Sequence, residues 1–507
     1  MVVPDFGTAI WVSRKEILMK PHVVIIMADQ LRADVLGKGF TPRIDAIAEE
    51  GISFENAYTA CPLCVPARGA FFTGTYPNHN GSLINPWEPA DAIYGDVKKE
   101  YETLYELMEE DWDSIHSGKQ HLFTEGGKLE DREDSKTTWC CTEKIYKQFL
   151  AAEGIKMPGG PRFRMRIPEM VNGKVTRVSS YSNANTGCYE PGEKYYFDRY
   201  FAEKAVEGLK NRNKEKPLLL NAMFLAPHPP LQIPEPWYGM VTDDQFELPE
   251  NVGVFYKRQS PLQMYNLTGI VGARYDKEHW KEAWRVYLGL VSMLDECVGQ
   301  IIDELKEQGI YDDSLIIFTS DHGEMLGSHG LFQKMCMYEE SARVPLYIKL
   351  PKKGMSGKMA AGTVVDQVVS HVDVMPTLCD YLGIRPKHQM DGRSLFPLLR
   401  GERMEKKAAY IQYDGNGSRS NFQRCVVNGK YKLIVDLFQN EAFYELYDLE
   451  KDSQETTNLM FDAAYDAVAS ELMGLLAAHM MKNRDMLTLP VYAADRFRSM
   501  YGPFEAP

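Results

Sequence analysis

The residues best suited to chemistry surround Cys64. In the segment Cys64-Val-Pro-Ala-Arg68-Gly-Ala-Phe-Phe-Thr73-Gly74, a proline, an arginine and a Thr-Gly pair follow the cysteine at short, defined spacings. A lone cysteine is by default an inert buried thiol, and Cys61-Pro-Leu-Cys64 could instead be a redox or zinc pair. Because no second Cys-x-x-Cys and no His-x₃-His accompanies that pair, zinc is weakly supported. The neighbours of Cys64 favour a third interpretation, in which position 64 carries the nucleophile.

Acidic residues follow two of the buried strands that the sequence predicts. Asp29 comes directly after the apolar run 22–28, and Asp321-His322 follows the run 314–319. An acidic residue after a strand is commonly a turn former or a helix cap, so neither position would stand out alone. Together with Cys64, the two carboxylates suit a hard divalent cation such as Ca²⁺, and the imidazole of His322 admits Mn²⁺ or another transition metal.

Basic and polar residues supply candidates for binding an anion. Lys119 and His121 alternate in a strand-like segment, so both side chains can face one site. His228 follows another buried strand, Lys334 lies thirteen residues beyond Asp321, and Asn85 lies twenty-one residues after Cys64. Taken alone, the Lys119 segment would be a solvated basic turn, and His228 could be a packed loop histidine between prolines.

The elements that must position these residues alternate between strands and helices. Continuous apolar runs at 22–28, 217–226 and 314–319 predict strands that are buried on both faces. Helices are expected at 41–50, where Pro42 suits the first turn, and over the amphipathic stretch 280–308. Sites in open α/β sheets form beyond the carboxyl ends of the strands, so we expect the polar residues after these strands to meet.

The Cys64 segment resembles the sequence at which a cysteine is converted to formylglycine, and the chain is thereby similar to the Cys-type sulfatases of the alkaline phosphatase superfamily. The resemblance runs discontinuously over residues 23–446. The pairs Asp29-Gln30 and Asp321-His322 are similar to those of choline-sulfatase-like, iduronate-sulfatase-like and phosphonate-monoester-hydrolase-like members. Gln120 departs from the pattern, because family members usually have Trp between the lysine and the histidine.

The resemblance implies one divalent metal, with Ca²⁺ expected before Mn²⁺ or Mg²⁺, and a formylglycine at position 64. A hydrated aldehyde offers two geminal hydroxyls: one attacks sulfur, and proton loss from the other expels sulfate. The implied metal ligands are Asp29, Gln30, the residue derived from Cys64, Asp321 and His322. The implied catalytic residues are Cys64, Arg68, Lys119, His121, His228 and Lys334, and the implied substrate-binding residues are Asn85, Lys119, His228 and Lys334.

The resemblance also assigns a role to each catalytic side chain. Arg68 would hold the hydrate and offset its charge, and Lys119 would bind the sulfate and leaving-group oxygens. His121 would take the hydrate proton during sulfate release, and His228 would act as general acid. Lys334 would neutralise the sulfate oxygens as charge builds in the transition state.

The implied activity is hydrolysis of sulfate monoesters, either carbohydrate sulfates or aryl and steroid sulfates. A formylglycine-generating enzyme would be needed for maturation. The same residues would also suit a phosphonate monoester or phosphodiester hydrolase, because sulfate and phosphoryl groups share a tetrahedral shape. A third alternative is a non-catalytic binding protein in which Cys64 stays unconverted.

Composition and charge limit the kinds of protein that this chain can be. The chain has 507 residues and a net charge of −14, which argues against nonspecific nucleic-acid binding. Apolar segments such as 23–28 are too short to span a bilayer. Residues 1–20 do not read as a signal peptide, and nine cysteines with an adjacent Cys140-Cys141 pair make a full disulfide framework unexpected. These observations predict a reducing, cytoplasmic location.

The expected fold class is α/β: an alkaline-phosphatase-like mixed, mostly parallel sheet between helices, followed by a smaller α+β subdomain. We place the catalytic domain at residues 20–395 and the subdomain at 396–507. Short strands around the Asn428-Gly429 turn and a helix at 462–481 are expected to form an antiparallel sheet with a helix on it. Residues 86–115 and 125–200 show no readable pattern, so loops that build a substrate-facing rim are expected there.

Overall fold

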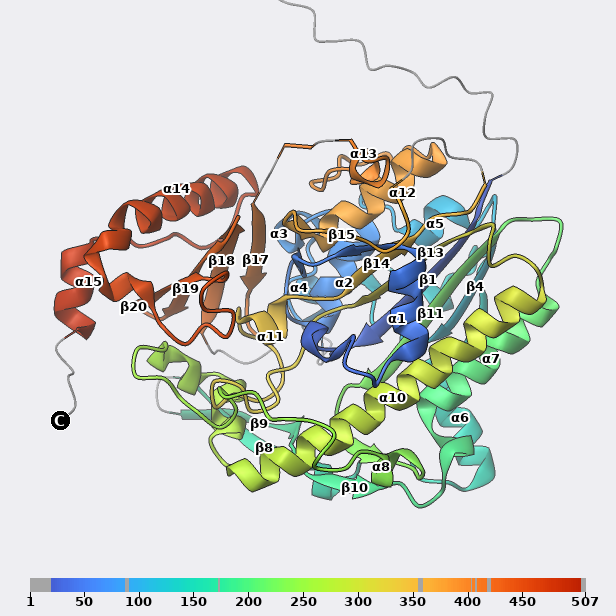
Figure 1. Cartoon of the computed structure of the whole chain (residues 1–507), viewed down its shortest axis with the longest axis horizontal. Coiled ribbons are helices and arrows are strands. Elements are labelled where there is room, and N and C mark those ends of the chain that lie inside the picture. The colour runs from blue at the N-terminus through green and yellow to red at the C-terminus, as the bar shows by residue number, and fades with distance from the viewer. Residues whose placement is uncertain are drawn as a thin grey trace, which may run out of the picture.

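A large sheet with helices on both faces and a smaller sheet beside it form the molecule (Figure 1). The computed structural model describes residues 20–86, 91–171, 174–353, 359–402, 404–405, 408–416 and 421–502. Asp29, Lys119, His228 and Asp321 lie at or just beyond the ends of strands of the large sheet, and the smaller sheet belongs to the C-terminal part of the chain.

The large sheet has eight strands in the order β15-β2-β14-β13-β1-β11-β4-β7. Its centre is parallel, since β1 pairs in parallel with both β13 and β11, whereas β14 runs antiparallel to its two neighbours. The expected mixed, mostly parallel sheet is therefore confirmed. The strand bounds, in sheet order, are Thr363–Val365, Ile52–Phe54, Leu346–Lys349, Ser314–Ser320, His22–Asp29, Leu218–Pro227, Asp113–Gly118 and Thr138–Cys141.

Strand β1 shows why its apolar run has no polar alternation. Val24, Ile26 and Ala28 pack into one core, and Val23, Ile25 and Met27 pack into the core on the opposite face. Helices cover both faces, so every side chain of the central strand after His22 is buried. The first core includes α1 (Pro42–Glu50), α7 (Phe197–Asn211) and α10 (Lys277–Glu307); the second includes α2 (Cys64–Thr73), α5 (Leu104–Met108), α12 (Val374–Leu382) and α13 (Phe396–Leu399).

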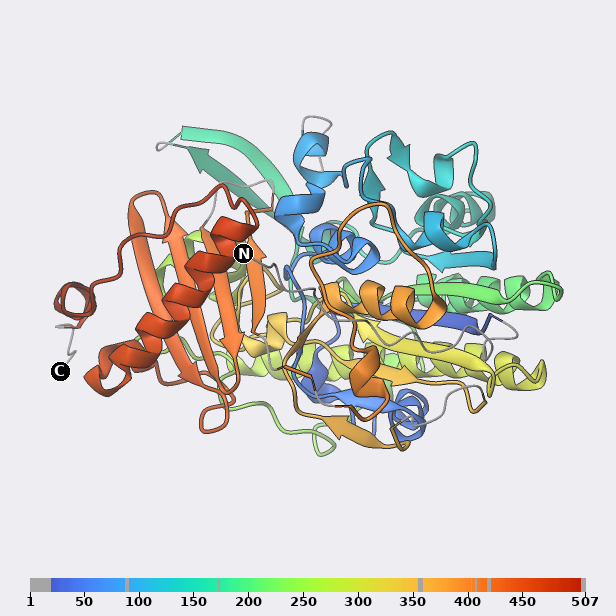
Figure 2. The same cartoon turned by 90° about the horizontal axis from the view of Figure 1, so that it is seen from above.

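The C-terminal part contains a four-stranded antiparallel sheet and a helix that lies across it (Figure 2). Leu472 and Leu476 of α14 pack into one core with Val426 and Leu433 of the sheet. The predicted α+β character is thus present, while the predicted boundary between residues 395 and 396 stays a prediction. The elements are β17 (Ala409–Tyr413), β18 (Phe422–Asn428), β19 (Tyr431–Phe438), β20 (Glu441–Asp448), α14 (Asp466–Lys482) and α15 (Ala494–Tyr501).

The region expected to be loop-rich instead contributes regular structure. It includes the first half of β4 and all of β7 in the large sheet, α6 (Glu143–Glu153), and a hairpin of β8 (Arg164–Val171) and β9 (Lys174–Ser182). A search for continuous apolar runs does not find β4, because its buried side chains are mostly polar and form hydrogen bonds. Ser117 Oγ donates to Phe201 O at 2.7 Å, and the Tyr105 hydroxyl lies 2.8 Å from His116 Nδ1.

Short elements complete the fold and connect its layers. Two small pairs are β3 (Ala57–Tyr58) with β16 (Val369–Ser370), and β10 (Thr186–Cys188) with β12 (Leu231–Ile233). A third is β5 (Phe123–Thr124) with β6 (Gly127–Lys128). The remaining helices are α3 (Pro77–Asn80), α4 (Ala92–Gly95), α8 (Trp237–Met240), α9 (Leu267–Gly272) and α11 (Glu339–Ala342).

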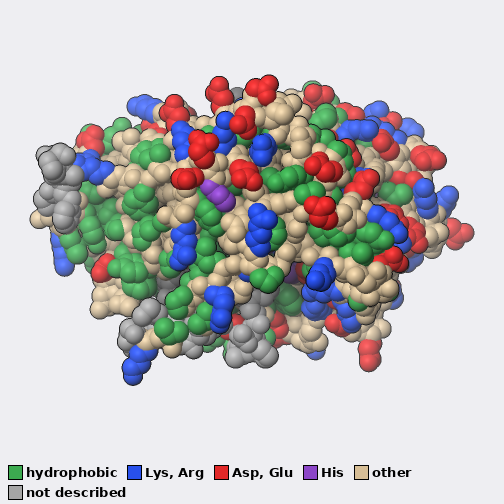
Figure 3. Space-filling view, turned by 90° about the horizontal axis from the view of Figure 1, so that it is seen from below, with side chains coloured by type: hydrophobic (Ala, Val, Ile, Leu, Met, Phe, Trp, Pro, Cys, Tyr) green, Lys and Arg blue, Asp and Glu red, His purple; other side chains and the backbone are tan. Residues whose placement is uncertain are grey.

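The distribution of charged side chains on the surface is consistent with the net charge of −14 (Figure 3). On the face shown in Figure 3, basic side chains are scattered among acidic ones and form no continuous basic tract of the kind that nucleic-acid binding requires. Within the described ranges, no helix combines the length and apolar character needed to cross a membrane. All nine cysteines are free thiols.

Candidate active site

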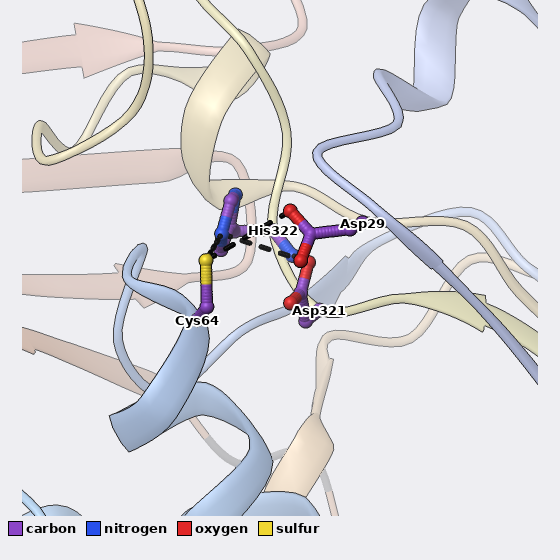
Figure 4. Close-up of side chains that lie close together, drawn as sticks. All are labelled: Asp29, Cys64, Asp321 and His322. Carbon is purple, nitrogen blue, oxygen red and sulfur yellow. Dashed lines mark hydrogen bonds and ion pairs between the residues drawn. The ribbon is translucent and has the colours of Figure 1, made fainter. Parts of the chain in front are cut away.

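Cys64 is the first residue of α2 and lies at the centre of a buried cluster. Its side chain is 2% exposed and points toward Asp29, Asp321 and His322, which come from two other segments of the chain (Figure 4). Cys64 Sγ lies 3.1 Å from His322 Nε2 and 3.8 Å from Asp29 Oδ1. The potential ligand atoms of these four residues all lie within 4.8 Å of one another. The structure therefore brings together residues that the sequence separates widely.

Strand register explains why the two aspartates meet. β1 and β13 are parallel neighbours with Ala28 opposite Ser320, so Asp29 and Asp321 leave the sheet side by side. Gln30 has a positive φ of 67° that turns the chain sharply after β1. Its backbone N–H then donates to Asp321 Oδ1 at 3.2 Å, which ties the ends of both strands together. This is the carboxyl edge at which the sequence predicted a site.

Arg68 joins the two buried carboxylates one helical turn after Cys64. Its Nε donates to Asp321 Oδ2 at 3.0 Å, and its Nη2 lies 3.4 Å from Asp29 Oδ2. A third bond, from Nη1 to Lys119 O at 2.9 Å, fixes the guanidinium against the segment after β4. All three charged groups of the two ion pairs are fully buried, so Arg68 offsets a desolvation cost that lone carboxylates would carry.

The donor set fits a divalent cation. Two carboxylates and one imidazole combine hard oxygen ligands with one nitrogen, a set that Ca²⁺ tolerates and Mn²⁺ favours. His322 Nδ1 donates to Gly323 O at 3.0 Å, so Nε2 is the ring nitrogen that can offer a lone pair to a cation in the cluster. Gln30 Oε1 accepts from Lys334 Nζ at 2.6 Å, so its role as a further ligand stays a prediction.

The cluster stabilises negative charge at position 64. Burial favours the neutral thiol, yet Lys119, Lys334 and His322 outweigh it and hold the pKa of Cys64 well below its usual value. The same balance acts on Asp29: burial and Cys64 oppose ionisation, but Lys119 and the nearby histidines lower the pKa of its carboxyl. A nucleophile placed here would therefore be deprotonated easily.

Lys119 and His121 reach the site, but not as alternate residues of a strand. β4 ends at Gly118, where a side chain is excluded because a Cβ would lie 1.8 Å from Met223 O. Lys119 Nζ lies 3.6 Å from Cys64 Sγ and forms a close ion pair with Asp29. His121 has a positive φ of 39° and lies outside any strand. The expected strand-like geometry was wrong because the chain turns at the sheet edge, which frees both side chains to point inward.

Lys334 and His228 form a second pair of basic residues at the site. Lys334 Nζ lies 3.1 Å from His228 Nε2, and His228 Nδ1 donates to Pro229 O at 2.5 Å. Burial and the neighbouring Lys334 lower the pKa of His228 to about 4, so the ring is neutral near pH 7. To act as the predicted general acid, His228 would need the negative charge of a bound ester to raise its pKa. Lys334 is the proton donor next to its Nε2.

Asn85 has a structural contact in addition to its predicted one. Its Oδ1 accepts from Val65 N at 3.0 Å and satisfies one of the free N–H groups at the start of α2. Asn85 therefore holds the helix that carries Cys64, and its contact with substrate stays a prediction.

Two glutamates were missed by the sequence reasoning. Glu143 Oε2 lies 3.3 Å from His121 Nε2, and Glu324 accepts from the side chain of Gln30 and from the backbone of Leu326. The only local signal was weak: Thr142-Glu143 resembles the start of a helix, and Glu324 follows the Asp-His-Gly segment. Neither signal shows which residue the carboxylate would contact.

Converging charged side chains mark the site around Cys64. A cavity of about 390 Å³ lies elsewhere, beyond the C-terminal end of α2, between Tyr76, Tyr410 and His479. Around Cys64 the side chains pack closely, and Lys119 and Lys334 are 1% and 4% exposed. His121 and Glu143 are more exposed, with side chains 13% and 37% accessible.

Comparisons with known proteins agree with this geometry. A family model described as Sulfatase matches residues 21–384, and one described as N-sulphoglucosamine sulphohydrolase, C-terminal, matches residues 327–482. A choline-sulfatase of Rhizobium meliloti is 30% identical over 87% of this chain and 82% of its own length. An arylsulfatase of Clostridium perfringens is 29% identical over 88% of this chain and 92% of its own length.

A solved structure shows the same fold. The phosphonate monoester hydrolase of Agrobacterium radiobacter superposes with a TM-score of 0.72 at 23% identity, covering 92% of this chain and 96% of that one. The Sulfatase family model and the sulfatase relatives favour an enzyme over a non-catalytic binding protein. Since the Sulfatase model spans most of the chain, this protein belongs to the sulfatase family and is a sulfuric ester hydrolase with the alkaline phosphatase superfamily fold.

Proposed function

We propose that the enzyme hydrolyses sulfate monoesters through a formylglycine made from Cys64 by a formylglycine-generating enzyme, together with one divalent metal. The observation that carries the proposal is the position of Cys64: at the start of a helix, nearly fully buried, with Asp29 and His322 within 3.8 Å of its sulfur. An inert core thiol has no need of buried charged neighbours, whereas a metal-activated nucleophile does.

The residues at the sheet edge would hold the metal. Asp29, Asp321 and His322 are the ligands that the donor chemistry supports, and Gln30 and the oxygen at position 64 are the further ligands that the family resemblance implies. We favour Ca²⁺, with Mn²⁺ and Mg²⁺ as alternatives. The bound cation would act as a Lewis acid on the nucleophile and on a sulfate oxygen.

The chain's own side chains would handle charge and protons. Lys119 Nζ lies 3.6 Å from Cys64 Sγ and Lys334 Nζ lies 3.1 Å from His228 Nε2, so their ammonium groups would bind the sulfate oxygens. Arg68 would keep the two aspartates ionised and in place. His121 would accept the proton of the hydrate, and the Lys334–His228 pair would supply a proton to the leaving oxygen.

The relatives act on different sulfate esters, so they indicate a range of substrates for this enzyme and no single one. Choline-sulfatase, arylsulfatase and an N-acetylglucosamine-6-O-sulfatase of Bacteroides thetaiotaomicron all resemble the chain over most of its length. We propose carbohydrate or aryl esters as the substrates. A phosphonate monoester or phosphodiester hydrolase is the second candidate, and the fold shared with a phosphonate monoester hydrolase favours it.

Parallel assays separate these candidates. The protein is co-expressed with a formylglycine-generating enzyme, and the peptide across Cys64 is analysed by mass spectrometry. We expect the mass of the aldehyde or its hydrate and turnover of an aryl sulfate well above that of the matching aryl phosphonate monoester. Cys64→Ala is the control for background hydrolysis. Faster turnover of the phosphonate would replace the first candidate by the second, and an unmodified thiol in fully active protein would refute the formylglycine mechanism.

A further inference from the structure

Glu143 stands beside His121 although the two residues come from different strand ends. β4 and β7 are parallel neighbours with Ser117 opposite Cys141, so the segments that follow them emerge together. Glu143 is the first residue of α6, and its Oε2 lies 3.3 Å from His121 Nε2. The helix start favours an anionic side chain at this place. Although burial opposes ionisation, His121 lowers the pKa of Glu143, so the carboxylate is a charged acceptor.

The contact decides which nitrogen of His121 carries a proton. A carboxylate can only accept, so His121 Nε2 must carry the hydrogen that bonds to Glu143. In the neutral ring this places the lone pair on Nδ1. With Nε2 turned to Glu143, Nδ1 is the ring nitrogen left for the role that the proposed function gives His121 at position 64.

We propose that Glu143 is a positioning residue that fixes the ring orientation and the Nε2–H tautomer of His121, so that Nδ1 is the atom that accepts the proton when sulfate is released. The inference rests on the proposed function, because it assigns a task to His121 in that reaction. A carboxylate that orients a histidine base is a recurring device in enzymes, but neither the motifs around Cys64 nor the spacing in the sequence assigns this carboxylate.

The proton and electron balance of the step is complete within the site. His121 Nδ1 takes the proton of the hydroxyl that did not attack sulfur. The electron pair of that O–H bond forms the carbonyl, the carbon–oxygen bond to the sulfate breaks, and sulfate leaves with the pair of that bond. His121 becomes an imidazolium, which the Glu143 carboxylate stabilises through Nε2–H, and it returns its proton to solvent.

The test combines kinetics with a direct view of the tautomer. Glu143→Ala removes the acceptor and Glu143→Gln keeps the shape with a weaker one. Glu153→Gln, at the far end of α6, is the matched control. We expect Glu143→Ala to lower kcat on an aryl sulfate by about 10–100-fold, with kcat/KM falling less because sulfate release follows the attack. Glu143→Gln should retain more activity. In His121→Ala, adding Glu143→Ala should cost nothing further.

The second readout does not depend on turnover. In protein with unconverted Cys64, nitrogen-15 NMR of the imidazoles, assigned with His121→Gln, should show the Nε2–H tautomer in wild type and its loss in Glu143→Ala. A kcat equal to that of Glu153→Gln, or an unchanged tautomer, would overturn the inference. If matured wild type lacks sulfatase activity, the proposed function fails, while the NMR result still decides the His121–Glu143 arrangement. Melting curves show whether each variant is folded.

Discussion

Lys119 offers the sharpest test of the electrostatics of the site. Its ammonium is buried, forms a close ion pair with Asp29, and lies 3.6 Å from Cys64 Sγ. Lys119→Met keeps much of the side-chain volume and removes the charge. Asp29 then retains Arg68, at 3.4 Å, as its remaining cationic partner on the helix side.

The expected magnitudes follow from burial. Removing one partner of a buried ion pair costs about 3–5 kcal/mol of unfolding free energy, and the Arg68 contact places this case near 3 kcal/mol. Loss of one group that stabilises transition-state charge lowers kcat by about 10²–10³-fold. In protein with unconverted Cys64, the thiol pKa should rise, because the nearest ammonium no longer offsets burial.

Lys432→Met is the matched control. Lys432 is also fully buried and paired, with Glu339 at 3.0 Å and Glu455 at 2.9 Å, but it belongs to β19 of the small sheet. Both variants should melt at lower temperature, and only Lys119→Met should slow turnover per folded molecule. The assays are thermal melting, aryl sulfate kinetics, and the pH dependence of Cys64 alkylation. If Lys119→Met left both kcat/KM and the Cys64 pKa unchanged, the electrostatic account of this site would be refuted.

The remaining predictions concern the metal, the backbone and pH. Asp321→Asn should lower metal content and activity together, measured by elemental analysis, and normal metal content would argue against its role as a ligand. Gly118→Ala should destabilise far more than Gly309→Ala in melting experiments: both glycines have positive φ, but only at Gly118 would a Cβ meet Met223 O, at 1.8 Å. Burial raises the pKa of Asp436 to about 7. Between about pH 4 and about pH 7, this carboxyl is therefore protonated more in the folded protein than in the unfolded one. The stability that the protonated carboxyl contributes is lost as the pH rises through this range. Asp436→Asn should therefore gain melting temperature relative to wild type between about pH 5 and about pH 8, and a constant difference would contradict the raised pKa.

The central strands could be predicted because their causes are local. A strand covered by helices on both faces is typically a near-continuous apolar run, and β1, β11 and β13 show this in most of their own residues. β4 could not be found in that way, since Ser114, His116 and Ser117 are buried through hydrogen bonds to groups distant in the chain. Only the assembled sheet supplies those partners.

The sequence by itself determined the chemistry that the site can perform: the motif around Cys64, the acidic residues after two strands, and the lysines and histidines that follow. Tertiary structure alone decided how these groups touch. The register of β1 on β13 joins Asp29 to Asp321, and that of β4 on β7 brings Glu143 to His121. Residue type is a property of one position, whereas a contact across 22 or 292 positions depends on how separate segments pair, which no local pattern encodes.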